Sequence, residues 1–174
     1  MQVVTILGDG SLVVEFHYTR NIYTIKVLGN GAAENDVIII EKFETPITPP
    51  LFTRMGYEFA GWDIPFPTAM PVTEEGFEIK AQWEIIDYSI GYIITNEYGI
   101  PGDDNPNPTS YTVEDEIVLP GLPFLDPNGV FIGWFVDEEM TQPFTEINLG
   151  CTGNITLYGL VRYSDEYSVQ LEKE

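Results

Sequence analysis

The sequence is poor in the residues that catalysis most often uses. A single cysteine, Cys151, leaves no pair for a disulfide, a redox motif or a cysteine metal site. A single histidine, His17, falls in the alternating stretch SLVVEFHYTR, with no recognisable nucleophile beside it. Carboxylates are so numerous that any two of them together carry no information about glycosidase chemistry. We therefore interpret His17 as structural and expect that the chain is not an enzyme.

Basic residues are also scarce. The chain has 7 Lys and Arg against 28 Asp and Glu, for a net charge of −21. This charge repels nucleic acid and anionic membrane surfaces, so we expect neither as a partner. The second half is the more acidic, with 12 acidic and 1 basic side chains in residues 87–163. We interpret the acidity mainly as a solubility device.

Long apolar runs are absent too. No stretch resembles a membrane-spanning helix, and the start MQVVTILGDG lacks the regions of a signal peptide. We expect no direct membrane insertion, and we expect any signal and anchor to lie outside this sequence. Residues 1–21 contain a strand pattern, which we interpret as a leading segment from the end of an upstream repeat.

The composition that is present favours strands. There are 16 Gly, 13 Pro and 23 aromatic residues, which are typical of many short strands joined by tight turns. Apolar residues make up 44 %, enough for packed cores. We predict a mainly β protein with little helix.

An internal repeat organises the chain. The strand pattern that starts at Tyr23 returns 65 residues later at Tyr88, and each is followed by a second strand, DVIIIEKF or SYTVEDEIVLP, and a proline-bearing loop. Gly-Trp pairs end at Trp62 and Trp134, and the closing strands FEIKAQW and ITLYGLV come last. We predict repeat 1 at residues 22–86 and repeat 2 at 87–163, with 164–174 as a tail or the start of a following strand.

These motifs resemble the Listeria–Bacteroides repeat, also called the internalin B-repeat family. The first copy carries the pattern P-x-x-x-x-x-GY-x-F-x-GW and the ending A-Q-W, and the second keeps Phe131, Gly133 and Trp134. We align Val130 with the usual Tyr and Val161 with the closing Trp, so the second copy departs further from the pattern.

The resemblance implies two tandem β-grasp-like domains with mixed, twisted sheets. It also implies a short helical turn after each second strand, at residues 51–55 and 122–126. Such repeats stand on bacterial surface or secreted proteins, often near a cell-wall anchor, so the expected localisation is extracellular.

A domain of about 60 residues is marginally stable alone. We therefore assign the motif residues to structural cores, rather than to ligand stacking. They are Tyr57, Phe59, Gly61, Trp62, Trp83, Phe131, Gly133 and Trp134. Only residues 84–87 separate the copies, which predicts a packed, stiff junction between neighbouring repeats.

Two acidic loops are weak candidates for calcium, because calcium binds several oxygen ligands. Asp103 and Asp104 lie in one loop, and Asp137, Glu138 and Glu139 in the other. Neither has EF-hand spacing, and turn chemistry also explains them. We expect no cofactor, and loops 99–109 and 137–154 are where a binding surface would be sought first.

Two functions are compatible with the sequence. The first is a non-enzymatic surface repeat that acts as a stiff spacer or adhesion element, with an unidentified protein or glycan partner at the cell surface. The second is a carbohydrate-binding module of a secreted glycan-processing protein. For the second, Tyr92, Tyr98 and Tyr111 are candidates for a sugar platform, although tyrosine is also common in strands.

Overall fold

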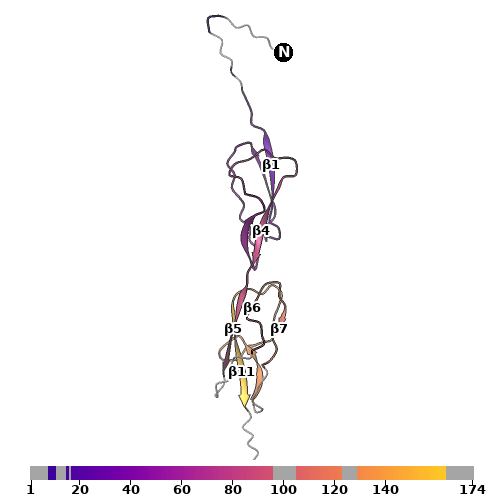
Figure 1. Cartoon of the computed structure of the whole chain (residues 1–174), viewed down its shortest axis with the longest axis vertical. Coiled ribbons are helices and arrows are strands. Elements are labelled where there is room, and N and C mark those ends of the chain that lie inside the picture. The colour runs from indigo at the N-terminus through magenta and orange to yellow at the C-terminus, as the bar shows by residue number, and fades with distance from the viewer. Residues whose placement is uncertain (1–7, 11–14, 16, 96–104, 123–128, 164–174) are drawn as a thin grey trace, which may run out of the picture.

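The computed structural model describes residues 8–10, 15, 17–95, 105–122 and 129–163. It contains two sheet-bearing units, stacked end to end along the long axis of the molecule (Figure 1). No helix occurs among the described residues. The prediction of a mainly β protein with mixed sheets is confirmed.

The first sheet has four strands, in the spatial order β2-β1-β4-β3. They are β1 (Ile22–Leu28), β2 (Val37–Lys42), β3 (Tyr57–Trp62) and β4 (Glu78–Ile85). β1 pairs with β2 as an antiparallel hairpin and with β4 in parallel, and β3 runs antiparallel to β4. The central parallel pair is the β-grasp-like arrangement that the family resemblance implied.

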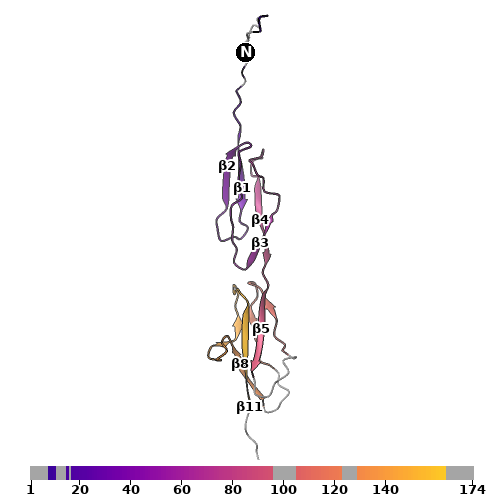
Figure 2. The same cartoon turned by 90° about the vertical axis from the view of Figure 1, so that its left-hand side faces the viewer.

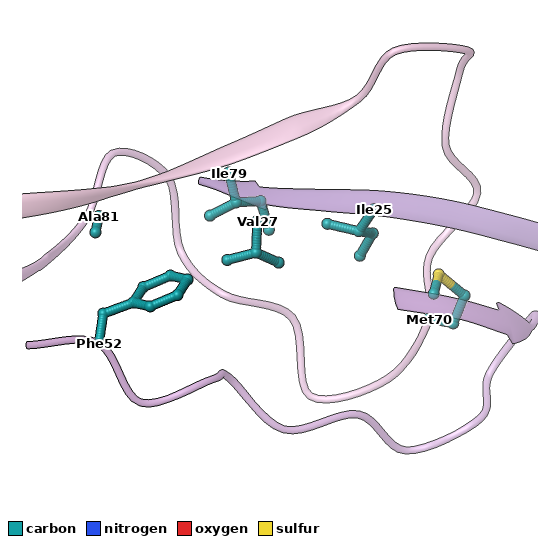
Figure 3. Packing of buried hydrophobic residues seen from close by; sticks show 6 residues of the cluster. All are labelled: Ile25, Val27, Phe52, Met70, Ile79 and Ala81. Carbon is teal, nitrogen blue, oxygen red and sulfur yellow. The ribbon is translucent and has the colours of Figure 1, made fainter. Parts of the chain in front are cut away.

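The core of the first repeat follows from the alternation of its central strands. Ile25 and Val27 of β1 and Ile79 and Ala81 of β4 are fully buried on one face. The same face is covered by loop residues, since Phe52 and Met70 pack over these strands (Figure 3). The period of two therefore places the apolar residues on the core side.

The second sheet repeats this order with one added strand, as β6-β5-β11-β8-β9. Again the two central strands, here β5 and β11, are parallel. A separate two-stranded ladder joins β7 to β10. The strands are β5 (Tyr88–Thr95), β6 (Ser110–Tyr111), β7 (Ile117–Val118), β8 (Gly129–Phe135), β9 (Pro143–Phe144), β10 (Glu146–Ile147) and β11 (Ile155–Tyr163).

The core of the second repeat is centred on Trp134, which is 3 % exposed. Ile90 of β5, Leu157 of β11 and Ile147 of β10 are buried around it. The indole Nε1 donates to the Pro120 carbonyl at 3.1 Å, which satisfies the polar atom of this buried ring.

The strand register corrects one alignment made from the sequence. In the first sheet Phe59 lies opposite Trp83 and Tyr57 opposite Ile85. In the second sheet Phe131 lies opposite Val161, and Gly129 lies opposite Tyr163. Gly129, not Val130, therefore occupies the position of the motif tyrosine.

The helical turn predicted at residues 51–55 is wrong. The backbone N–H of Thr53 donates to the Glu34 carboxylate at 2.7 Å, and the Thr53 carbonyl accepts from Ala33 at 2.7 Å. These groups are thus unavailable for helical hydrogen bonds, and the preceding Pro49-Pro50 pair also disfavours a helix. Of the second predicted turn, Leu122 is not helical, and 123–126 lie outside the described residues.

The single second strand predicted for repeat 2 is also wrong. SYTVEDEIVLP forms two short strands, β6 and β7, separated by a turn at Thr112–Asp115. The Asp115 carboxylate accepts from both the N–H and the hydroxyl of Thr112, at 2.7 and 2.9 Å. This side chain competes with the sheet for the backbone and so interrupts the strand.

The leading segment differs from its predicted strand as well. Residues 17–21 have no regular structure, and most of the preceding residues of that pattern lie outside the described part. His17 is exposed, with its Nε2 3.6 Å from the Glu15 carboxylate. It is therefore a surface residue and not part of a core.

Candidate functional site at the repeat junction

The two repeats are joined with almost no linker. β4 continues to Ile85 and β5 begins at Tyr88, so only Ile86 and Asp87 lie between the strands. The Ile86 N–H donates to the Gly56 carbonyl at 2.9 Å, which ties the link to the turn before β3. The link is thus hydrogen-bonded to the first repeat.

An apolar contact closes the junction. Val113, in the turn after β6, is 8 % exposed and packs against Gly56 of the first repeat. Gly56 has φ +76°, and a Cβ at this position would lie 2.0 Å from Val113 Cγ1. Glycine is therefore required twice, for its backbone conformation and for the close approach of the valine.

The turn that carries Val113 is held from within. The Asp115 carboxylate accepts from Thr112, as described above. In addition, Asp115 N–H donates to the Thr112 carbonyl at 3.2 Å, and Glu114 N–H donates to Thr112 Oγ1 at 3.3 Å. The Val113 carbonyl accepts from Gly150 N–H at 2.8 Å. These bonds, all within the second repeat, hold the turn that carries Val113.

A polar contact lies beside the apolar one. The Tyr57 hydroxyl donates to the Glu114 carboxylate across the junction. The Arg54 guanidinium lies over the Tyr57 ring, with Cζ 3.7 Å from the ring centroid. The hydrogen bond to Glu114 is the main cause that raises the pKa of Tyr57 above its ordinary value.

Met55 of the first repeat lies near Gly150 of the second. Its Cε would lie 3.7 Å from a Cβ built at Gly150, an ordinary van der Waals distance. Gly56 and Tyr57 of the first repeat therefore meet Val113 and Glu114 of the second.

The motif aromatics lie in three different settings. Trp134 is buried, whereas Trp62 and Trp83 are half-buried against the first core. Phe59 is 45 % exposed and makes edge contacts with both tryptophans, at centroid distances of 5.1 and 5.7 Å. The prediction that Phe59 is a core residue is therefore wrong. It lies on β3, which is an edge strand of the sheet.

Tyr57 also differs from its predicted place. Its hydroxyl and ring are engaged by Glu114 and Arg54 at the junction. Gly61 has φ +119° at the register shift between β3 and β4, which explains a glycine there. Gly133 lies at the corresponding shift in the second sheet.

The second acidic loop is explained by its own hydrogen bonds. One oxygen of Asp137 accepts from the N–H and hydroxyl of Thr141, at 2.9 and 2.7 Å, and the other accepts from Gln142 N–H at 2.7 Å. The backbone bond from Thr141 is the largest of the causes that lower the pKa of Asp137. Glu138 and Glu139 are exposed beside it, while Asp103 and Asp104 lie outside the described residues.

Within the described parts of the chain, no group of three or more His, Cys, Asp or Glu side chains is placed to hold a metal ion. A hollow of about 410 Å³ lies between β1 and the loop at 73–77, and its lining includes Lys26. The Lys26 ammonium is 3.3 Å from the Glu78 carboxylate. The hollow thus presents a partly neutralised cation.

Two of the three tyrosines proposed as a sugar platform are described, and both are held by contacts within the second repeat. Tyr111 is 2 % exposed, and its hydroxyl donates to the Gly153 carbonyl. Tyr92 packs on Trp134, with centroids 4.9 Å apart, and donates to the Pro108 carbonyl at 2.8 Å. Tyr98 lies outside the described residues. Tyr111 is therefore too deeply buried to stack on a sugar, whereas Tyr92 is half-buried.

Sequence reasoning did not identify Val113, Glu114 or Arg54. The stretch containing the first two was predicted as strand, and the Gly-Tyr pair at 56–57 was assigned to the core. A signal was present in the Thr-x-x-Asp spacing of Thr112 and Asp115, which is typical of a side-chain-closed turn.

Comparison with known proteins identifies the second repeat. No curated protein and no solved structure matches the chain. No helix in the described residues is long and apolar enough to cross a membrane. The family model of the Listeria-Bacteroides repeat domain matches residues 88–159, the copy that departs further from the motif. These repeats are typical of extracellular bacterial proteins, and residues 88–159 are identified as one of them.

Proposed function

We propose that this chain is a non-enzymatic, extracellular repeat module that acts as a stiff spacer or adhesion element. The observation that carries the proposal is the junction, where Val113 fills the space left by Gly56 and Tyr57 bonds to Glu114. A chain that only linked two independent domains would not need these contacts. The proposal makes neighbouring repeats of the same chain its principal partners.

The elongated arrangement supports a spacer. The last strand of the first repeat leads directly into the first strand of the second, so the units continue along one axis (Figure 1). A two-residue link reaches at most about 7 Å, so the two units remain close together at the junction. Length therefore adds up from repeat to repeat.

The test measures the distance between the two repeats by pulsed electron spin resonance. Spin labels are placed at Glu75→Cys and Thr156→Cys, both exposed positions, with Cys151→Ser to remove the native thiol. We expect one narrow distance distribution. Val113→Ser should broaden it, because the substitution removes the apolar contact with Gly56.

Val118→Ser is the matched control. It is the same substitution in the same repeat, at a valine that is 71 % exposed and lies on β7, which pairs with β10 of the same repeat. It should leave the distribution narrow. A distribution that is already broad in the parent chain would contradict the proposed spacer.

A further inference from the structure

The edge of the first sheet has an unusual strand. β2 is the outermost strand, beside β1 and away from β4 (Figure 2). Because an edge strand pairs on one side only, half of its backbone N–H and C=O groups face outward. β2 has six residues and contains no proline or glycine, with the sequence VIIIEK. Its counterpart β6 has only two residues and follows Pro106 and Pro108.

The solvent-facing side of this edge is apolar. Ile38 and Ile40 are 62 % and 61 % exposed, whereas Ile39 is half-buried toward the core. Edge strands of soluble proteins usually carry a charge or proline among such residues. Here the charges stand at the two ends, with exposed Asp36 before the strand and Glu41 and Lys42, both exposed, as its last two residues.

We propose that β2 is a homodimerisation edge that pairs with β2 of a second copy of this chain. When the strand is laid antiparallel on itself about Ile39, Asp36 falls opposite Lys42 of the partner copy and Ile38 opposite Ile40. The outward row Asp36-Ile38-Ile40-Lys42 is therefore self-complementary in charge and in apolar character. The two four-stranded sheets join into one sheet about a two-fold axis.

The second copy is favoured over other occupants by this match. In the opposite orientation, with the strands parallel and in register, Lys42 would meet Lys42 and Asp36 would meet Asp36. Only the antiparallel arrangement pairs opposite charges at both ends, and a two-fold axis generates it without further parts. One Asp36 oxygen already accepts from Gly29 N–H at 3.0 Å, and the other oxygen can meet the lysine.

Charge makes the association depend on salt in a definite direction. Each chain carries −21, so two copies repel each other at long range, and salt screens this repulsion. The Asp36–Lys42 pairs are exposed and contribute little by themselves. Backbone pairing and burial of the isoleucines dominate, so the dimer should strengthen as salt is added.

The first test is sedimentation velocity of the whole chain over a range of protein and salt concentrations. We expect a monomer–dimer equilibrium that shifts toward dimer at high salt. Ile40→Lys should raise the dissociation constant at least about tenfold, because an edge lysine opposes strand pairing. Val118→Lys adds the same charge at an exposed site of the second repeat and should have far less effect.

The second test fixes the register by cross-linking in a Cys151→Ser background. A mixture of Ile38→Cys and Ile40→Cys chains should form a disulfide dimer rapidly, since these positions oppose each other. Either chain alone should cross-link much more slowly. Both substitutions are made at exposed positions, so we expect the fold to be preserved. Circular dichroism of each variant checks this.

A chain that stays monomeric at every salt concentration would overturn the proposal and leave the edge to an extended segment of another protein. A dimer that Ile40→Lys does not weaken, or in which the mixed cysteine pair shows no preference, would overturn it equally.

Discussion

At the scale of single residues, glycine at position 56 is set by its neighbour in the other repeat. Gly56 has φ +76° and faces Val113, and Gly76 has the similar φ of +80° with open space around it. The two glycines thus share a backbone requirement and differ in the steric one. This pair allows the effect of the junction contact to be isolated.

Gly56→Ala should loosen the junction, because its Cβ would lie 2.0 Å from Val113 Cγ1. Gly76→Ala should leave the junction intact. Both should destabilise the first repeat by about 1–2 kcal/mol through the left-handed backbone. Urea unfolding measures the stability loss expected for both variants. Small-angle scattering of the folded molecules should show a bent shape for Gly56→Ala and a straight shape for Gly76→Ala. Equal scattering curves for the two variants would contradict this role of Gly56.

Tyr92 makes a prediction about pH. Burial raises its pKa to about 12, above the ordinary value of 10.0. The proton is thus held more tightly in the folded state, and the associated stability is complete below pH 10 and is lost as the pH rises from 10 toward 12. The slope from this group is at most about 1.4 kcal/mol per pH unit.

Unfolding of the second repeat, followed by the methyl NMR signals of its core residues Ile90 and Leu157 at pH 9 and 11, measures the effect. Tyr92→Phe should flatten the dependence between these two values, because the titrating group is gone. It should also cost some stability at pH 9, since the bond to the Pro108 carbonyl is lost. An unchanged pH slope in Tyr92→Phe would show that another group is responsible.

At the scale of strands, the closing strands explain why the two copies differ beside their tryptophans. Trp62 lies opposite Ala81, and Trp134 lies opposite Gly159. A Cβ at Gly159 would be 2.8 Å from the Trp134 ring and 3.3 Å from Phe131. Trp134 is buried more deeply than Trp62, and the residue opposite it on β11 is Gly159, where the first repeat has Ala81 on β4.

Gly159→Ala should destabilise the second repeat by about 1–3 kcal/mol, because overpacking of a buried ring forces its neighbours to move. Gly91→Ala is the matched control on the adjacent strand, where the nearest atom to a new Cβ is Thr156 Oγ1 at 3.5 Å. That change should be neutral or slightly stabilising. Thermal unfolding of both variants tests the difference, and equal losses would contradict the packing argument.

The strands themselves were predictable, because alternation and the Gly-Trp landmarks mark β1, β3, β4, β5, β8 and β11 directly. The turn at 112–115 and the irregular segment at 51–54 were not predicted. In both, a side-chain carboxylate takes backbone N–H groups that regular structure would have used. Only the folded chain reveals which residue each carboxylate meets.

The sequence predicted a packed junction but not the residues that form its contacts. The short spacing between Trp83 and Tyr88 indicates a packed link, since four residues cannot form a loose tether. The contacting residues lie far apart in sequence, however, with the strands β3 to β6 and the link between Gly56 and Val113. No local pattern pairs them, which is why Tyr57 was assigned to the core.

At the scale of the whole molecule, the account predicts that two small domains move as one body. Each domain has its own core, and the contacts described between them lie in the short turns at residues 55–57 and 113–114. These contacts support stiffness because they lie beside a link of only two residues. The junction and the strand edge β2 lie in different parts of the first repeat, so spacing and side-by-side pairing are separable properties.

The most direct measurement of this central claim is the rotational diffusion of the two repeats, from ¹⁵N relaxation and residual dipolar couplings of the whole chain. It is made at low salt with dilute protein, to favour the monomer. The account predicts that a single elongated diffusion tensor and a single alignment tensor fit both repeats, and that Val113→Ser separates them into two. Independent tensors for the two repeats in the unaltered chain would contradict the account.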